Sequence, residues 1–326
     1  MYPRAVAAYD TPRPVLTPSN PRDFLGIEGL RVEELLALLA RAESLLPAAL
    51  GREAAPRKLE GRVVANLFFE DSTRTRVSFE IAAKRLGAEV VNLSASGSSA
   101  SKGETLLDTA RNIEAMGVDA IVVRTSISGG AALVAGKVEC PVINAGDGRH
   151  EHPTQALLDV LTIRERLGSI QGRNIAIVGD IANSRVARSV THALVALGAK
   201  VIAVGPPALL PEGFENLARG AGSIEITHDL DSIIGKIDAI MMLRIQLERA
   251  AGMGIASDYR SAYGLTSARR AKLRPGVPIL HPGPVNRGVE IDDAVADDSV
   301  DSLILRQVSF GVAARMAVLL RALEAR

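Results

Sequence analysis

The sequence is short of cysteine, of aromatic residues and of net charge, and each shortage excludes a class of protein. Its single cysteine, Cys140, can form no disulfide within the chain and no thiolate metal cluster. Aromatic residues make up 3% of the 326 and tryptophan is absent, so we expect an aliphatic core. The formal net charge of +1 gives no reason to expect a nucleic-acid or membrane partner. Any anion site must be a local concentration of Arg and Lys.

Long apolar segments are absent as well. No run reaches the roughly 20 residues that a membrane-spanning helix needs, and the N-terminus has no signal-peptide core. These observations predict a cytoplasmic protein. Cys140 lies in an apolar stretch, which indicates a buried, unreactive thiol.

Helical and strand patterns alternate after a proline-rich tail. Residues 1–21 contain five prolines, which disfavour helix and sheet, so we expect an extended tail. A helix should begin at Pro153, since proline suits the first helical turn. The last helix should bury one face, made of Val308, Val312, Met316, Leu319, Leu320 and Leu323. Strand-like apolar runs lie at 63–69, 89–93, 120–123, 142–144, 175–178, 201–204, 224–227, 239–243 and 278–280.

This alternation predicts an α/β protein of two domains, each a mainly parallel sheet flanked by helices. We expect the first domain to comprise residues 22–151 together with 305–326. The second domain should comprise residues 152–304.

A concentration of donors lies between the first expected strand and the next helix, where residues 70–76 read Glu-Asp-Ser-Thr-Arg-Thr-Arg. A helix N-terminus offers unpaired N–H groups and a positive dipole end. Ser72, Thr73 and Thr75 add hydroxyl donors, and Arg74 adds a planar fork suited to phosphate oxygens. The combination favours an anion site. The alternative is ordinary helix capping by Ser72 or Thr73, with surface arginines.

The segment 72–76, together with His152-Pro153-Thr154-Gln155, resembles two motifs of the aspartate and ornithine carbamoyltransferases. The resemblance runs from about residue 22 to the C-terminus. The resemblance implies that Arg74, Thr75 and His152 are catalytic, because they would donate hydrogen bonds to the carbamoyl oxygen, which gains negative charge during the reaction. It also implies that no cofactor or metal takes part. From its position after the apolar run 120–123 alone, Arg124 would be interpreted as a surface charge at the end of a strand. The residues implied to bind carbamoyl phosphate are Ser72, Thr73, Arg74, Thr75, Ser98, Lys102, Arg124, His152 and Gln155.

The small, polar segment 94–103 reads by itself as a plain surface loop. It resembles the family loop that reaches into a neighbouring subunit's active site. Ser98 and Lys102 match the functional positions of that loop, and Lys102 is implied to be catalytic and to contact both substrates. The resemblance therefore implies a homotrimer of catalytic chains with shared active sites.

The second half of the chain should select the amino-acid substrate. Gly179-Asp180 ends a strand, but no G-x-G-x-x-G follows, so a dinucleotide site is not indicated. Arg244 and Gln246 point to one side of an extended segment and could bind one carboxylate, although a charged strand edge is the equal alternative. The residues that the resemblance assigns to aspartate are Lys102, Arg185, Arg244, Gln246, Gly283 and Pro284.

The segment His281-Pro282-Gly283-Pro284 resembles the aspartate members, whereas ornithine members carry His-Cys-Leu-Pro. Gly283 departs from those aspartate members that have Leu at this position. The resemblance thus implies transfer of the carbamoyl group of carbamoyl phosphate to L-aspartate, in pyrimidine biosynthesis. The alternatives are ornithine or another amine as acceptor, or a non-catalytic scaffold chain of the same fold.

Two further features of the sequence each allow two interpretations. His150-Glu151-His152 has a spacing seen in zinc sites, but no thiolate is nearby, and we expect no metal. The tail carries Tyr2, Tyr9 and Leu16, which could anchor on another protein. Dihydroorotase or a dihydroorotase-like chain is the candidate partner, and a solvated tail is the alternative.

Overall fold

The structure is a computed structural model that describes residues 20–94, 104–245 and 258–324. These residues form two compact units. One contains residues 20–162, Arg188–Ala193 and 305–324, and the other contains Ile163–Ala187 and Leu194–Ile304. The first boundary falls inside helix α5 (Pro153–Leu167), whereas the sequence pattern placed it at residue 152. Helix α5 begins at Pro153, as expected.

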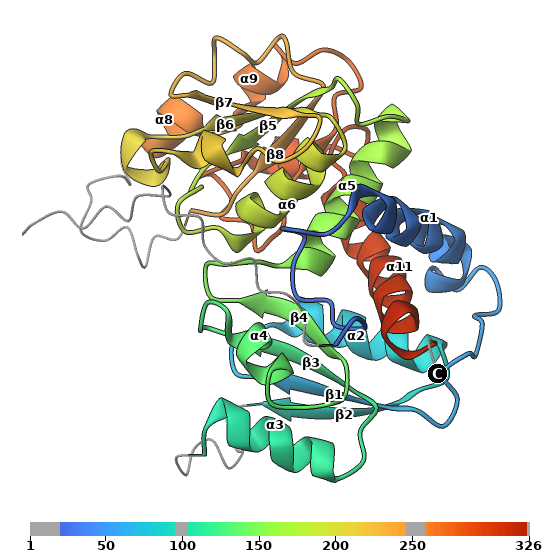
Figure 1. The fold of residues 1–326 in the computed structure, drawn as a ribbon. Helices are drawn as coiled ribbons and strands as arrows, with labels where there is room; N and C mark the ends of the chain where they lie inside the picture. The colour runs from blue at the N-terminus through green and yellow to red at the C-terminus, as the bar shows by residue number, and fades with distance from the viewer. Residues whose placement is uncertain (1–19, 95–103, 246–257, 325–326) are drawn as a thin grey trace, which may run out of the picture. The chain divides into compact units, whose positions relative to one another are not determined.

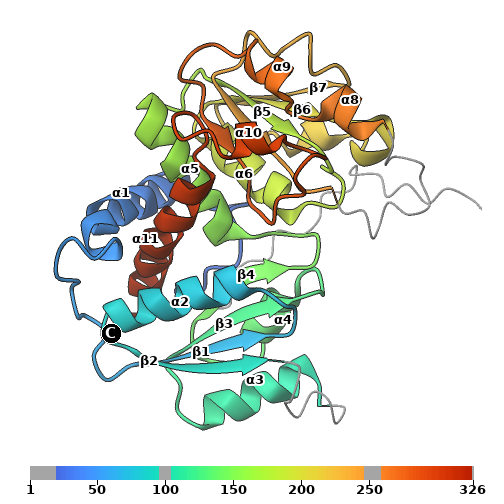
Figure 2. The ribbon, with the colours of Figure 1, turned by 180° about the vertical axis from the view of Figure 1, so that it is seen from behind.

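The first unit is built on a parallel sheet of four strands in the order β2-β1-β3-β4 (Figure 1). The strands are β1 (Val63–Phe68), β2 (Glu89–Ser94), β3 (Ala120–Thr125) and β4 (Val142–Asp147). Helices α3 (Leu106–Ala115) and α4 (Gly130–Ala135) lie on one face, and α2 (Thr73–Arg85) lies on the other (Figures 1 and 2). Helix α1 (Val32–Ala49) contacts α2.

The alternation of side chains along each strand explains why helices cover both faces of the sheet. Successive side chains of a strand point to opposite faces of the sheet. Leu67, Ile121 and Val123 therefore meet Ala110 of α3 and Val134 of α4 in one buried aliphatic cluster. Because both faces are covered, the strands are apolar almost throughout, which is why the sequence shows them as continuous apolar runs.

The second unit contains a parallel sheet of five strands in the order β7-β6-β5-β8-β9. These are β5 (Asn174–Val178), β6 (Lys200–Val204), β7 (Ser223–Thr227), β8 (Ala239–Met242) and β9 (Ile279–Leu280). Its helices include α6 (Arg185–Ala196), α8 (Tyr259–Tyr263), α9 (Ser267–Arg270) and α10 (Asp293–Ala296). All nine strands expected from the sequence are present, and the predicted fold class is confirmed.

The last helix, α11 (Ile304–Leu323), packs with the first unit from residue 305 onward. The expected buried face is wrong at Val308, whose side chain is 49% exposed. Met316, Leu319, Leu320 and Leu323 of the expected face are buried, together with Phe310 and Ala314, which the pattern did not include. Among the described residues, no helix combines the length and the apolar character that crossing a membrane requires.

Each sheet has a switch point, where the chain leaves one strand toward one edge and later returns on its other side. The order of the first sheet places this point between β1 and β3. The order of the second places it between β5 and β8. In open parallel sheets, ligands bind beyond the carboxyl ends of the strands at these points. The two switch points are therefore the positions at which to look for functional side chains.

Candidate functional site

The loop from β1 to α2 begins at the first switch point. Ser72 precedes the first turn of α2 with φ −163° and ψ 99°, and its side chain accepts no capping hydrogen bond. No acidic residue lies in that first turn. Thr75 is buried, whereas Thr73 and Arg74 are exposed. Capping therefore does not account for the Ser72 hydroxyl, and the helix N-terminus keeps its positive character for an anion.

Arg124 lies on the other side of the same switch point. Its backbone is paired with Phe68, the last residue of β1. Arg124 is 8% exposed as a residue, so it is no surface charge at a strand end. Arg124 Nη2 donates to Glu70 Oε1 at 2.7 Å, and Nη1 donates to the Ala145 carbonyl at 3.1 Å. These bonds hold the guanidinium group beside the loop that contains Arg74.

His152 and Gln155 follow β4, at the next strand end of the same sheet. His152 is 4% exposed, and its N–H donates to Ser189 Oγ at 2.8 Å. Gln155 belongs to the first turn of α5, and its Nε2 donates to Asp159 Oδ1 at 2.9 Å. The carboxyl ends of β1, β3 and β4 thus position all the carbamoyl phosphate candidates that the structure describes.

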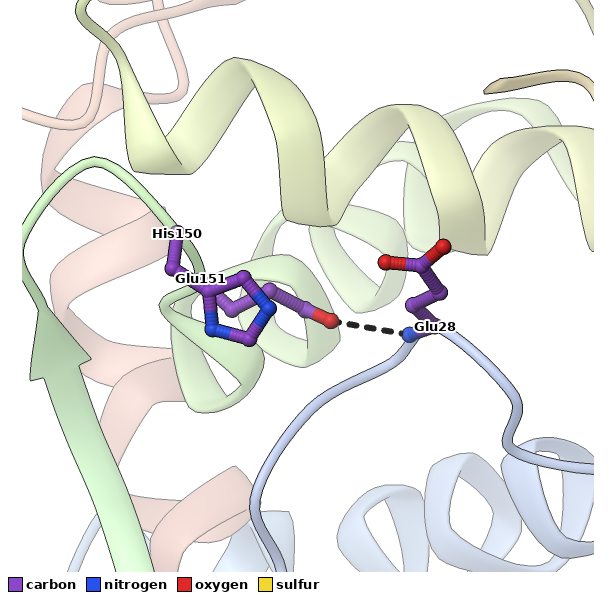
Figure 3. Close-up of side chains that lie close together, drawn as sticks. All are labelled: Glu28, His150 and Glu151. Atoms are coloured by element: carbon purple, nitrogen blue, oxygen red, sulfur yellow. Dashed lines mark hydrogen bonds between the residues drawn. The ribbon is translucent and has the colours of Figure 1, made fainter. Parts of the chain in front are cut away.

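A buried carboxylate supports the backbone at His152. Glu151 is fully buried and accepts a hydrogen bond from the Ile27 N–H at 2.8 Å. It also accepts one from the Glu28 N–H at 2.9 Å, which Figure 3 shows. The Ser189 hydroxyl donates to it at 2.7 Å. Because Ser189 also accepts the His152 N–H, the Glu151 carboxylate is linked to that backbone through one hydroxyl group.

The cluster in Figure 3 is the arrangement closest to a metal site among the described residues. One potential ligand atom from each of Glu28, His150 and Glu151 lies within 4.8 Å of the others. Both Glu151 oxygens already accept N–H or O–H donors, and His150 Nδ1 lies 3.1 Å from Asp147 Oδ2. Hydrogen bonding between segments far apart in sequence accounts for the cluster.

The second switch point also carries two arginines. Arg185 is the first residue of α6, after β5, and Arg244 follows β8. The ends of these strands approach closely at Gly179, which has φ 135°. A Cβ there would lie 3.0 Å from Leu243 Cβ, so only glycine allows this approach. The fold therefore brings the segment before Arg185 against the segment that carries Arg244.

The Gly283–Pro284 loop is fixed by a buried histidine. His281 Nδ1 accepts the Gly283 N–H at 2.8 Å, so Nε2 carries the proton and donates to Glu290 Oε1 at 3.0 Å. The same Glu290 oxygen accepts the N–H of Asn286, whose Nδ2 donates to the Ile245 carbonyl at 2.9 Å. The loop is thereby joined to the residue after Arg244.

Gly283 itself has φ 66°, a left-handed conformation that a side chain would strain. This conformation explains why glycine suits position 283.

Three predicted site residues, Ser98, Lys102 and Gln246, lie outside the described residues, as does the tail up to residue 19. Sequence reasoning considered Glu151 only as part of a possible metal site and missed Asp159 and Glu290. All three hold neighbouring site residues through hydrogen bonds. Only Asp159 had a sequence signal, since it lies one helical turn after Gln155.

Two parallel α/β units, each with arginines at its switch point, define a two-domain enzyme architecture for anionic ligands. Residues 22–165 match the model of the aspartate/ornithine carbamoyltransferase carbamoyl-P binding domain. Residues 171–322 match the model of the aspartate/ornithine carbamoyltransferase Asp/Orn binding domain. The chain belongs to the aspartate/ornithine carbamoyltransferase family.

Individual relatives agree with this assignment. The aspartate carbamoyltransferase catalytic subunit of Myxococcus xanthus is 56% identical over 300 residues, which are 91% of this chain and 98% of the relative. The corresponding subunit of Gluconacetobacter diazotrophicus is 50% identical over 319 residues, covering 97% of this chain and 96% of the relative.

Solved structures show the same fold without separating the two acceptor types. Aspartate transcarbamoylase from Trypanosoma cruzi, in complex with carbamoyl aspartate and phosphate, superposes with a TM-score of 0.84 at 33% identity. That match covers 93% of this chain and 96% of the other. Ornithine carbamoyltransferase from Pyrococcus furiosus also superposes with a TM-score of 0.84, at 30% identity. That match covers 95% of this chain and 99% of the other. The backbone is thus common to both, and the acceptor must be argued from side chains and sequence relatives.

Proposed function

We propose that this chain transfers the carbamoyl group of carbamoyl phosphate to the amine of L-aspartate. The products are N-carbamoyl-L-aspartate and phosphate, which places the reaction in pyrimidine biosynthesis. The observation that carries the proposal is the pair of switch points, one with a phosphate-type loop and the other with two arginines. The acceptor follows from relatives of 50–56% identity, which are named for aspartate.

Carbamoyl phosphate is assigned to the unit that contains residues 20–162. Ser72, Thr73, Arg74 and Thr75 hold the phosphate through hydroxyl groups, a guanidinium group and the N-terminus of α2. Arg124 completes this set from the end of β3, where its bond to Glu70 fixes its position. The ion pair between the buried Arg124 and the partly exposed Glu70 keeps the guanidinium in place before the phosphate arrives.

The carbamoyl group is assigned to His152 and Gln155. The amine attacks the carbamoyl carbon, a C–N bond forms, and the carbamoyl oxygen gains negative charge. Arg74, Thr75 and His152 donate to that oxygen, and removing one such donor typically costs about 10²–10³ in turnover. The C–O bond to phosphate then breaks, and the departing phosphate takes the amine proton. No separate protein base is required.

Aspartate is assigned to the unit that contains Arg185, Arg244, Gly283 and Pro284. Its two carboxylates match the planar forks of the two arginines. Gln246 adds an amide donor, and Lys102 contacts both substrates. The hydrogen bonds of His281 and Asn286 support this assignment, because they hold the Gly283 loop and the segment after Arg244 together.

The assembly proposed is a homotrimer in which Ser98 and Lys102 complete the site of a neighbouring chain. Apolar side chains near the edge strand β2 support an interface there, since Val77 and Ile81 on α2 and Val91 on β2 are 42%, 38% and 43% exposed. Mixing Lys102→Ala chains with Arg74→Ala chains should restore activity, because a hybrid can contain one intact shared site. The absence of recovery after verified subunit exchange would disprove the shared site.

The tail, residues 1–21, is proposed to dock on dihydroorotase or a dihydroorotase-like chain. Its support is compositional, since apolar side chains such as Tyr2 and Leu16 accompany five prolines. Deleting residues 1–21 should lower the mass of the complex formed with that partner while leaving catalysis intact. A complex of unchanged mass would assign the tail no role in assembly.

The experiment that tests the proposed function is an assay of the purified full chain with carbamoyl phosphate. Aspartate and ornithine are offered in parallel, and carbamoylated product is measured by mass spectrometry. We expect N-carbamoyl aspartate only. Citrulline instead of carbamoyl aspartate would reverse the acceptor assignment, and the absence of both products would support a scaffold role.

A further inference from the structure

The Gln155 side chain is held by a buried carboxylate one helical turn further along α5. Gln155 Nε2 donates to Asp159 Oδ1 at 2.9 Å, an i to i+4 pair on one helix face. Gln307 Nε2, from α11, donates to the same oxygen at 2.7 Å. Asp159 is fully buried, and the two glutamines are 9% and 2% exposed.

Packing alone does not explain why an aspartate occupies position 159. Burial raises the pKa of its carboxyl to about 7, although bonds from Gln307 and Gln155 and the charge of Arg315 act in the opposite direction. Within the part of the chain that the structure describes, Asp159 Oδ2 accepts no hydrogen bond. Burying a carboxylate with incomplete hydrogen bonding is unfavourable, and an apolar residue would be more stable at this position.

We propose that Asp159 is a positioning residue that fixes the orientation of the Gln155 amide and so makes the site prefer a carbamoyl group to an acyl group. The inference rests on the proposed function, in which Gln155 faces the carbamoyl group. A carboxylate has no hydrogen to donate, so the Gln155 group that faces it must be the NH₂. In the neutral acid the proton sits on Oδ2, because Oδ1 already accepts two hydrogen bonds.

The consequence is a fixed acceptor in the site. With its NH₂ committed to Asp159, Gln155 presents its oxygen, Oε1, on the other side of the amide. No described residue donates a hydrogen bond to this oxygen. An amide oxygen in this position accepts an N–H from the carbamoyl NH₂ and offers nothing to a methyl group. A rotated Gln155 would instead set its own NH₂ against the NH₂ of the substrate.

Two stable phosphonates distinguish the two orientations of the Gln155 amide. Phosphonoacetamide and 2-oxopropylphosphonate differ only in the group on the carbonyl carbon, NH₂ in one and CH₃ in the other. Neither can transfer its acyl group, so their dissociation constants can be measured by calorimetry on the full chain. We expect the native protein to bind the amide on the order of tenfold more tightly, the value of one well-formed hydrogen bond.

Three variants test the role of Asp159. Asp159→Leu removes the acceptor, and the preference for the amide should fall to near unity while the affinity for the ketone stays the same. Asp159→Asn keeps an oxygen for Gln155 and Gln307, and should retain the preference. Thr162→Val is the matched control, because Thr162 is buried in the same helix and bonds only to the Leu158 carbonyl.

Several results would overturn the inference. An unchanged preference in Asp159→Leu would do so, as would equal weakening of both phosphonates. If the Leu variant does not fold, Asp159→Asn decides, since loss of the preference in a folded Asn variant contradicts the positioning role. Failure of the proposed function is distinguishable, because the native protein would then bind neither phosphonate and form no carbamoyl aspartate.

Discussion

Gly26→Ala should destabilise the unit that contains Glu151, although it adds a single methyl group. Gly26 directly precedes Ile27 and Glu28, whose N–H groups donate to the Glu151 carboxylate. A Cβ at position 26 would lie 2.4 Å from Glu151 Oε1 and 3.0 Å from Cδ. The backbone there is not left-handed, so alanine would introduce this clash without backbone strain.

The size of the destabilisation expected for Gly26→Ala follows from the burial of Glu151. Its side chain is 0% exposed, so the carboxylate can move only by lengthening its own hydrogen bonds. Overpacking of this kind costs about 1–3 kcal/mol. In a unit of this size, about 2 kcal/mol lowers Tm by roughly 4–8 °C. Because Ser189 connects Glu151 to the His152 N–H, we also expect a lower kcat.

Thermal unfolding at matched protein concentration, together with steady-state kinetics, checks both effects. Gly235→Ala is the control, because a Cβ there meets only the Lys272 carbonyl at 4.0 Å and the backbone is again not left-handed. That variant should be as stable as the native protein or slightly more stable, since alanine restricts the unfolded chain. If Gly26→Ala unfolds at the same temperature as Gly235→Ala, the reasoning about Glu151 is refuted.

Three further predictions concern substrate binding, pH and the thiol. Arg244→Ala should abolish saturation with aspartate and leave the affinity for phosphonoacetamide nearly intact by calorimetry; equal loss of both would contradict the assignment. Because burial raises the pKa of Asp159 to about 7, well above the value of about 3.9 in an unfolded chain, its contribution to stability is lost as pH rises toward that pKa. The gain in stability from Asp159→Asn, measured by denaturant titration, should therefore be larger at pH 8 than at pH 5 by about 2 kcal/mol, and a gain independent of pH would argue against an ionised buried carboxyl. Burial, with the nearby Glu114 carboxylate, raises the pKa of Cys140 to about 12, so iodoacetamide at pH 8 should label the unfolded chain and not the native one; rapid native labelling would show an accessible thiolate.

Much of the fold could be predicted from local patterns. The buried parallel strands are apolar on both faces, so they stand out as short apolar runs, and the helices between them show their own spacing. The pattern was wrong at Val308, because it shows which residues of α11 share a face but not where the covering layer ends. Helix α5 continues from one compact unit into the other, and a continuous helix shows the same pattern on both sides of that point.

The candidate site could be predicted in part. The hydroxyl and guanidinium groups of residues 72–76 are consecutive, so their chemistry is visible in the sequence itself. Arg124 could not be separated from a surface charge by its sequence, because its burial and its bond to Glu70 depend on the pairing of β3 with β1.

By itself, the sequence determined the elements, their parallel arrangement and the chemistry of the phosphate loop, because each depends on residues within one turn or one strand. Only the tertiary structure decided which groups meet across long sequence separations. Gln307 bonds to Asp159 across 148 residues, and Glu151 bonds to the Ile27 N–H across 124. Such contacts depend on the order of strands in the sheet and on the packing of helices against it. Local periodicity carries no information about either, so these buried hydrogen bonds appear only when the chain is folded.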